Sequence, residues 1–146
     1  MKPTFDGGHI AVGTVTNTGT AARDLWLVKT NDTGKVVWSK RLGFNTANGE
    51  IGQDVIQQTD SSYAFIGKTN FYGSLTDGMI GVVSANGTAQ WIRQFSYNSG
   101  DEGYSLVQSG ETLVAAKNSL LNVYKINGSR LTVQPGRFIQ HQLVVM

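Results

Sequence analysis

Residues 24–38 read DLWLVKTNDTGKVVW, and this stretch decides the fold because it recurs along the chain. Residues 77–91 read DGMIGVVSANGTAQW, with the aspartate, the turn glycine and the tryptophan at the same places. Residues 120–132 read LLNVYKINGSRLT and keep the apolar run and the turn glycine, but the aspartate and the tryptophan are lost. A repeat of about 50 residues indicates a fold assembled from similar supersecondary units.

Each copy is expected to contain four short strands, because apolar and β-branched runs alternate with Gly, Asn and Asp. The strands are predicted at 9–15, 25–30, 36–42, 54–58, 63–68, 79–83, 91–95, 105–108, 112–117, 121–125, 131–134 and 138–140. A hairpin turn with a glycine at positive φ is expected between the second and third strands of each copy. No segment of ten residues has helical periodicity, so we expect almost no helix.

The strand at 25–30 carries apolar side chains on both faces, which predicts burial on both sides. Trp26 is expected in the core because Met79 and Leu120 hold its place in the other two copies. In the first strand of the third copy, Ala116 aligns with the glycine of the other copies. The third copy is therefore the most divergent of the three.

The chain is predicted to be a single all-β domain, 1–146, made of three units at about 6–59, 60–109 and 110–146. It contains no Cys, which excludes disulfides, thiolate catalysis and Cys-based zinc sites. Charged residues make up 15%, below the roughly 25% of an average domain, and the formal net charge is only +2. No stretch approaches the ~18 apolar residues of a membrane helix, and the N-terminus shows no signal peptide.

The residues of the first unit carry more information than their periodicity alone. DGGHIAVG (6–13), DLWLVKTNDTGKVVWSK (24–40) and DVIQQT (54–59) resemble a repeat common in secreted and surface proteins of bacteria and archaea. The resemblance covers about residues 6–117, and at residues 60–62 Asp-Ser-Ser replaces the Asp-Gly-Gly of the pattern. It implies β-propeller-like blades of four strands, in proteins that serve in adhesion, scaffolding or carbohydrate contact. It also suggests a secreted or cell-surface location.

Three blades raise a question of closure, because propellers usually close with four to eight blades. The chain is a piece of a longer propeller, or two chains complete a six-bladed ring, or the three units form a β-trefoil. The residues of the repeat favour propeller blades. Open blade edges would expose unpaired backbone groups, so we expect self-association as a homodimer.

Four residues are candidate ligand-binding positions. Trp38 and Trp91 could stack on sugar rings, although an aromatic residue that recurs with its strand is more often a packing anchor. Asp24 and Asp77 could face a channel as ligands, although capping of the turn that enters each strand is favoured.

Other motifs indicate little chemistry. Residues 98–102, NSGDE, lack the full spacing of a calcium loop and are expected to be a solvated turn. The two histidines, His9 and His141, stand apart and predict no metal site or catalytic triad. The sequons beginning at Asn31, Asn86 and Asn127 are explained by turn chemistry. Basic residues are scattered, so no nucleic-acid partner is expected.

The sequence therefore predicts a non-enzymatic binding or scaffold module, with a protein or a glycan as partner and with no metal or cofactor. One alternative is an enzyme with its site at the mouth of an oligomeric ring. Another is a fragment that keeps the fold but has no activity of its own.

Overall fold

The computed structural model describes residues 1–19, 22–43, 49–70, 76–95, 102–117, 120–125, 127–132 and 144–145. All the regular elements in these ranges are strands, as the sequence predicts. The strands are β1 (Lys2–Pro3), β2 (His9–Thr16), β3 (Arg23–Thr30), β4 (Val36–Leu42), β5 (Ile51–Gln57), β6 (Tyr63–Thr69), β7 (Asp77–Val83), β8 (Ala89–Phe95), β9 (Gly103–Ser109), β10 (Thr112–Lys117), β11 (Leu120–Lys125), β12 (Arg130–Thr132) and β13 (Val144–Val145). Within the described ranges, no helix is long and apolar enough to cross a membrane.

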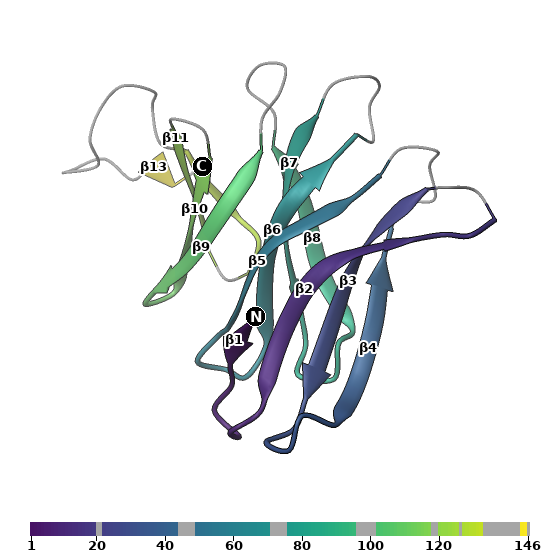
Figure 1. Cartoon of the computed structure of the whole chain (residues 1–146). Helices are drawn as coiled ribbons and strands as arrows, with labels where there is room; N and C mark the ends of the chain where they lie inside the picture. Colours follow the sequence, from purple (N-terminus) through teal and green to yellow (C-terminus); the bar gives the residue numbers. More distant parts are fainter. Residues whose placement is uncertain are drawn as a thin grey trace.

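The strands form three antiparallel sheets, which Figure 1 shows side by side. The first sheet has the order β1-β2-β3-β4, the second β5-β6-β7-β8, and the third β13-β12-β11-β10-β9. The described strands pair only within these three sheets and do not close a barrel. This pairing disfavours the β-trefoil alternative, because a trefoil needs strands of different units to pair around a common barrel.

The sheets are displaced by one strand from the sequence units. The sequence grouped β5 with the first unit, but β5 is the first strand of the second sheet, where Val55 pairs with Phe65 of β6. The short turn between β5 and β6 favours this antiparallel pairing of neighbours in sequence. The two-residue strand β1, which the sequence did not predict, takes the same place in the first sheet, with Lys2 opposite Ile10.

The second sheet lies between the other two and is buried on both faces. Every residue of β7 is buried, and in β6 only Lys68 is half-exposed. Side chains from the first and second sheets form one apolar cluster: Ile10, Leu25, Leu27, Val55, Tyr63, Phe65, Met79 and Val83. Side chains from the second and third sheets form another: Ala64, Ile66, Ile80, Val82, Phe95, Leu106, Leu113 and Ala115.

Trp26 departs from its prediction. It lies on the face of the first sheet that points away from the second, and 40% of its surface is exposed, whereas Met79 at the same repeat position is buried. The alternation of side chains across β3 sends Leu25 and Leu27 inward and Trp26 outward. Because the first sheet is at the end of the stack, no described part of this chain covers that face.

The register of the third sheet corrects one alignment. Gly52 and Gly67 are cross-strand partners in the second sheet, and the corresponding pair in the third sheet is Gly103 and Lys117. Lys117, not Ala116, therefore stands where the first strands of the other units have glycine. A one-residue difference in the length of the preceding turn produces this shift, since it changes which residue meets the neighbouring strand.

The hairpin turns agree with the sequence prediction. Gly34, Gly87 and Gly128 take φ values of 81°, 83° and 85° in the turns that join β3 to β4, β7 to β8 and β11 to β12. In the first of these turns, the Asn31 side chain accepts hydrogen bonds from the backbone of Thr33 at 3.1 Å and of Lys35 at 2.8 Å. The Asn residue of that sequon is thus part of the turn itself.

Candidate functional site

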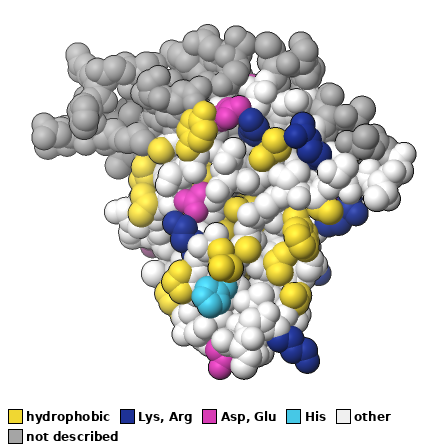
Figure 2. All heavy atoms as spheres, viewed as in Figure 1, with side chains coloured by type: hydrophobic (Ala, Val, Ile, Leu, Met, Phe, Trp, Pro, Cys, Tyr) yellow, Lys and Arg dark blue, Asp and Glu magenta, His cyan; other side chains and the backbone are white. Residues whose placement is uncertain are grey.

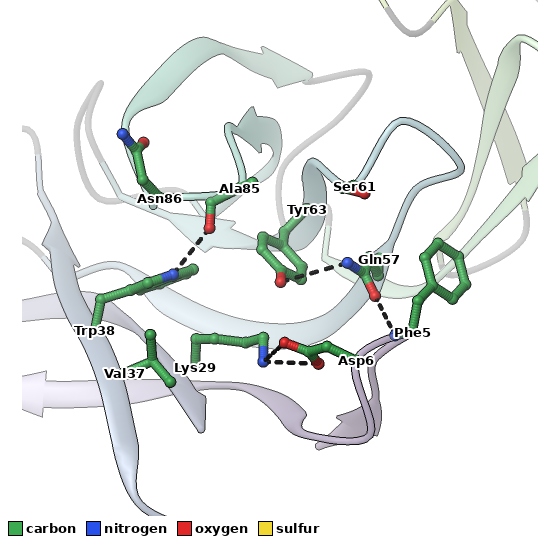
Figure 3. A pocket seen from close by; sticks show the side chains of 10 residues that line it. All are labelled: Phe5, Asp6, Lys29, Val37, Trp38, Gln57, Ser61, Tyr63, Ala85 and Asn86. Carbon is green, nitrogen blue, oxygen red and sulfur yellow. Dashed lines mark hydrogen bonds and ion pairs between the residues drawn. The ribbon is translucent and has the colours of Figure 1, made fainter. Parts of the chain in front are cut away.

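A cleft of about 440 Å³ opens between the first and second sheets, at the end where the hairpin turns gather. Figure 3 shows the side chains that line it, which come from the β1–β2 turn, from β3 and β4, and from β5, β6 and the turns of the second sheet. Three features matter for binding: aromatic rings, an ion pair and side-chain amides. Trp38 is the one sequence candidate that lies in this cleft.

The aromatic rings of the cleft are held by contacts within the protein. Trp38 and Tyr63 meet edge to face, with ring centroids 5.7 Å apart and planes at 66°. The Trp38 indole Nε1 donates a hydrogen bond to the Ala85 carbonyl oxygen at 2.9 Å. Tyr63 is 2% exposed, and burial raises the pKa of its hydroxyl above the ordinary value. Two rings that are held in this way keep their orientation without a ligand.

The ion pair joins Asp6 to Lys29. Lys29 Nζ lies 3.0 Å and 2.8 Å from the two carboxylate oxygens of Asp6 and 2.7 Å from the carbonyl oxygen of Thr30. The Lys29 side chain is 5% exposed, whereas that of Asp6 is 61% exposed. The buried lysine ammonium thus has protein acceptors for its hydrogen bonds, and the Asp6 carboxylate is exposed to solvent.

The β1–β2 turn holds the carboxylate in place. Asp6 Oδ1 also accepts hydrogen bonds from the Thr4 hydroxyl at 2.5 Å and from the Gly8 amide at 3.1 Å. The hydrogen bond from Lys29, followed by those from Thr4 and Gly8, holds the pKa of Asp6 well below its usual range. Gly8 admits no side chain, because a Cβ there would overlap the Thr30 carbonyl oxygen and lie 2.8 Å from Lys29 Nζ.

The same turn carries an exposed aromatic ring. Phe5 is 70% exposed, and its backbone amide donates to Gln57 Oε1 at 2.7 Å across the two sheets. The contact repeats one sheet further on, where the Thr59 amide donates to Gln108 Oε1 at 3.2 Å. Each glutamine therefore connects the first strand of its sheet to the turn of the preceding sheet. This role was not predicted, although Gln57 and Gln108 occupy matching places in the repeats.

Trp91 is a packing anchor, as the favoured interpretation predicts. It packs against the cluster between the second and third sheets, and a Cβ on Gly128 would lie 2.9 Å from its ring. Trp38 lies in the same way under Gly87, where a Cβ would be 3.1 Å from Cε3. Each tryptophan thus supports the hairpin turn of the next sheet. Trp38 differs from Trp91 because Trp38 also lines the cleft.

Asp24 and Asp77 lie outside the cleft lining and bond across strands. Asp24 forms an ion pair with Arg41 at 2.5 Å, and the Asp77 carboxylate accepts a hydrogen bond from Gln94. Arg41 and Gln94 are at matching positions of β4 and β8. The loops that enter β3 and β7 include residues beyond those described, so capping of these turns stays a prediction.

One carboxylate that the sequence analysis did not single out joins the first strands of all three sheets. Asp54 of β5 lies 3.5 Å from Lys2 Nζ of β1, and its Oδ2 accepts the Leu106 amide of β9 at 3.1 Å. Its Oδ1 accepts the Val55 amide at 2.9 Å. These partners make Asp54 a structural connector, since its carboxylate is occupied by groups of the chain itself.

The remaining candidates lie elsewhere. His9 is half-buried in β2 opposite Thr30, and His141 and residues 98–101 are outside the described residues. Glu102, the last residue of the NSGDE segment, pairs with Lys68 at 2.6 Å, and this hydrogen bond lowers the pKa of Glu102 below its usual range. In the described part of the chain, His, Asp and Glu form no cluster of three that could hold a metal ion.

Comparison of the sequence with protein-family models and with curated proteins finds no match. The resemblance to the surface-protein repeat is therefore carried by the residues of the repeat alone.

Proposed function

We propose that the protein is a non-enzymatic binding module, built of propeller-like blades, that binds a neutral saccharide in the cleft between its first and second sheets. The observation that carries the proposal is the fixed, solvent-facing carboxylate of Asp6 beside aromatic rings. Saccharides present apolar ring faces and many hydroxyl donors. An aromatic wall and fixed acceptors are the groups that such a ligand needs.

The balance of charge favours a neutral ligand. Lys29 lies beneath Asp6 and compensates its charge, so the cleft contains a paired carboxylate and not a free anion. Among the described residues, Asp6 Oδ2 has one hydrogen-bond partner, Lys29, whereas Oδ1 has three. Oδ2 can therefore accept a ligand hydroxyl. Gln57 and Asn86 add side-chain amides to the lining.

The enzyme alternative has less support. Glycoside hydrolysis generally needs two carboxyl groups, one of which must be protonated to act as an acid. Asp6 is the carboxylate among the lining residues, and its low pKa keeps it ionised. A group of this kind accepts hydrogen bonds but donates no proton at neutral pH.

The propeller-like arrangement is proposed on two grounds. In each of the three sheets, the first four strands along the chain form an antiparallel meander. Each sheet packs face to face against the next. The tryptophan and glutamine contacts recur from one pair of sheets to the next. Repetition of one packing relation is what a blade architecture requires.

A glycan array of neutral oligosaccharides, followed by titration calorimetry with the best binder, tests the proposal. We expect Phe5→Thr, which installs the residue of the second repeat, and Asp6→Asn each to weaken binding by at least about tenfold. The control is Trp91→Phe. Trp91 corresponds to Trp38 in the repeat but lies away from the cleft, so this variant should leave the affinity unchanged. The proposal fails if no neutral saccharide binds, or if both cleft variants bind as the unaltered protein does.

A further inference from the structure

The outer face of the first sheet, which no described part of the chain covers, has the pattern of an interface. Ala11, Trp26 and Val28 lie on this face, opposite the side chains that pack against the second sheet. Trp26 is 40% exposed, and the others are half-buried. Figure 2 shows hydrophobic side chains over the region that β2 and β3 occupy in Figure 1.

The repeat shows what this face is shaped to contact. Phe65 and Met79 hold the positions of Ala11 and Trp26 in the second sheet, and both are buried against the first sheet. Phe65 pairs across strands with Gly81, where a Cβ would be 2.5 Å from the phenyl ring. In the first sheet the corresponding pair is Ala11 with Val28. The larger partner is Phe65 of β6 in the second sheet and Val28 of β3 in the first sheet. Each sheet thus keeps an apolar pair at this position.

The outer face of the third sheet has the complementary pattern. Val107 is 57% exposed, and Val114 lies opposite it in β10. The strand register places them where the second sheet has Ile56 and Ala64, which pack against the third sheet. One end of the stack therefore presents the kind of face that receives a following sheet, and the other end presents the kind that receives a preceding one.

We propose that the outer face of the first sheet binds the outer face of the third sheet of a second copy of this chain. This contact continues the packing between the first and second sheets and between the second and third. Two copies that use both faces close a ring of six sheets, within the usual range of four to eight. The contact is heterologous, since two different faces meet, and closure limits the assembly to a dimer. The proposal does not depend on the saccharide cleft.

Two variants that each block one face test this contact by mixing. Trp26→Lys places a charge on the outer face of the first sheet, and Val107→Glu places one on that of the third. We expect the unaltered protein to be a dimer by light scattering across dilution and each variant alone to be a monomer. An equimolar mixture of the two variants should recover a one-to-one dimer, because one unaltered contact remains in it.

Other results of the same measurements would overturn the proposal. If the first sheets met each other, Val107→Glu would stay dimeric and Trp26→Lys would not; if the third sheets met, the reverse would hold. Either result overturns the proposal, and so does an unaltered protein that is monomeric at every concentration. Asp32→Lys in an exposed hairpin turn is the charge control and should dimerise normally. Circular dichroism of each variant establishes that it is folded.

Discussion

The second sheet pairs a glycine with a large aromatic residue where the first sheet pairs two leucines, and this difference predicts a strong energetic coupling. Gly78 and Phe95 are cross-strand partners, and at the same repeat positions the first sheet pairs Leu25 with Leu42. A Cβ on Gly78 would overlap the Phe95 ring, which is 2% exposed. The ring thus occupies the space that two leucines share in the first sheet.

Single substitutions should each destabilise the protein. Phe95→Leu leaves unfilled space over Gly78 and should cost about 1–2 kcal/mol. Gly78→Leu drives a side chain into the ring and should cost about 3 kcal/mol, at the upper end for overpacking. The backbone at Gly78 does not have a positive φ, so strain in the main chain adds nothing.

The double variant Gly78→Leu with Phe95→Leu copies the pair of the first sheet. It should come within about 1 kcal/mol of the unaltered protein, which corresponds to a favourable coupling of at least about 3 kcal/mol. Urea unfolding followed by fluorescence, at one protein concentration for all four proteins, measures this cycle. Additive effects, with a double variant as unstable as the two singles together, would refute the reasoning that the two positions share one volume.

Three further predictions concern the turns and the cleft. Gln108→Leu removes the acceptor for the Thr59 amide and should lower the free energy of unfolding by about 1–2 kcal/mol in a urea titration. Ser61 has a φ of 70°, so Ser61→Gly, which restores the glycine of the first repeat, should raise the melting temperature, with a gain of about 0.5–1 kcal/mol; a lower melting temperature would contradict this account. Because Lys29 lowers the pKa of Asp6 in the folded state, the stability from this pair is present above about pH 4 and is lost as the pH falls further. Acid unfolding of Lys29→Met should therefore show a smaller loss between about pH 5 and 2 than the unaltered protein, and equal losses would count against the pair.

The strands and their turns could be predicted from the sequence because their causes are local. The alternation in residues 36–42 and 112–117 gave the bounds of β4 and β10 as the structure has them. The glycines at the hairpin turns follow from the positive φ that these turns need. The recurrence of Trp38 and Trp91 with their strands indicated packing anchors, and both tryptophans support the next hairpin turn.

The tertiary structure decided which strands share a sheet and which residues meet in the cleft. β5 belongs to the second sheet because its backbone hydrogen bonds go to β6, a choice that its own side-chain pattern does not specify. The exposure of Trp26 follows from the place of the first sheet at the end of the stack, not from β3 itself.

The cleft depends most on long-range contacts. Lys29 reaches Asp6 across 23 residues, and Gln57 reaches the Phe5 amide across 52. Local patterns report the neighbours of a residue along its own strand. Lys29 meets Asp6 only when strands pair within the first sheet, and Gln57 meets the Phe5 amide only when the first and second sheets pack face to face. The sequence by itself determined the repeating unit; the packing of one unit on the next determined the site.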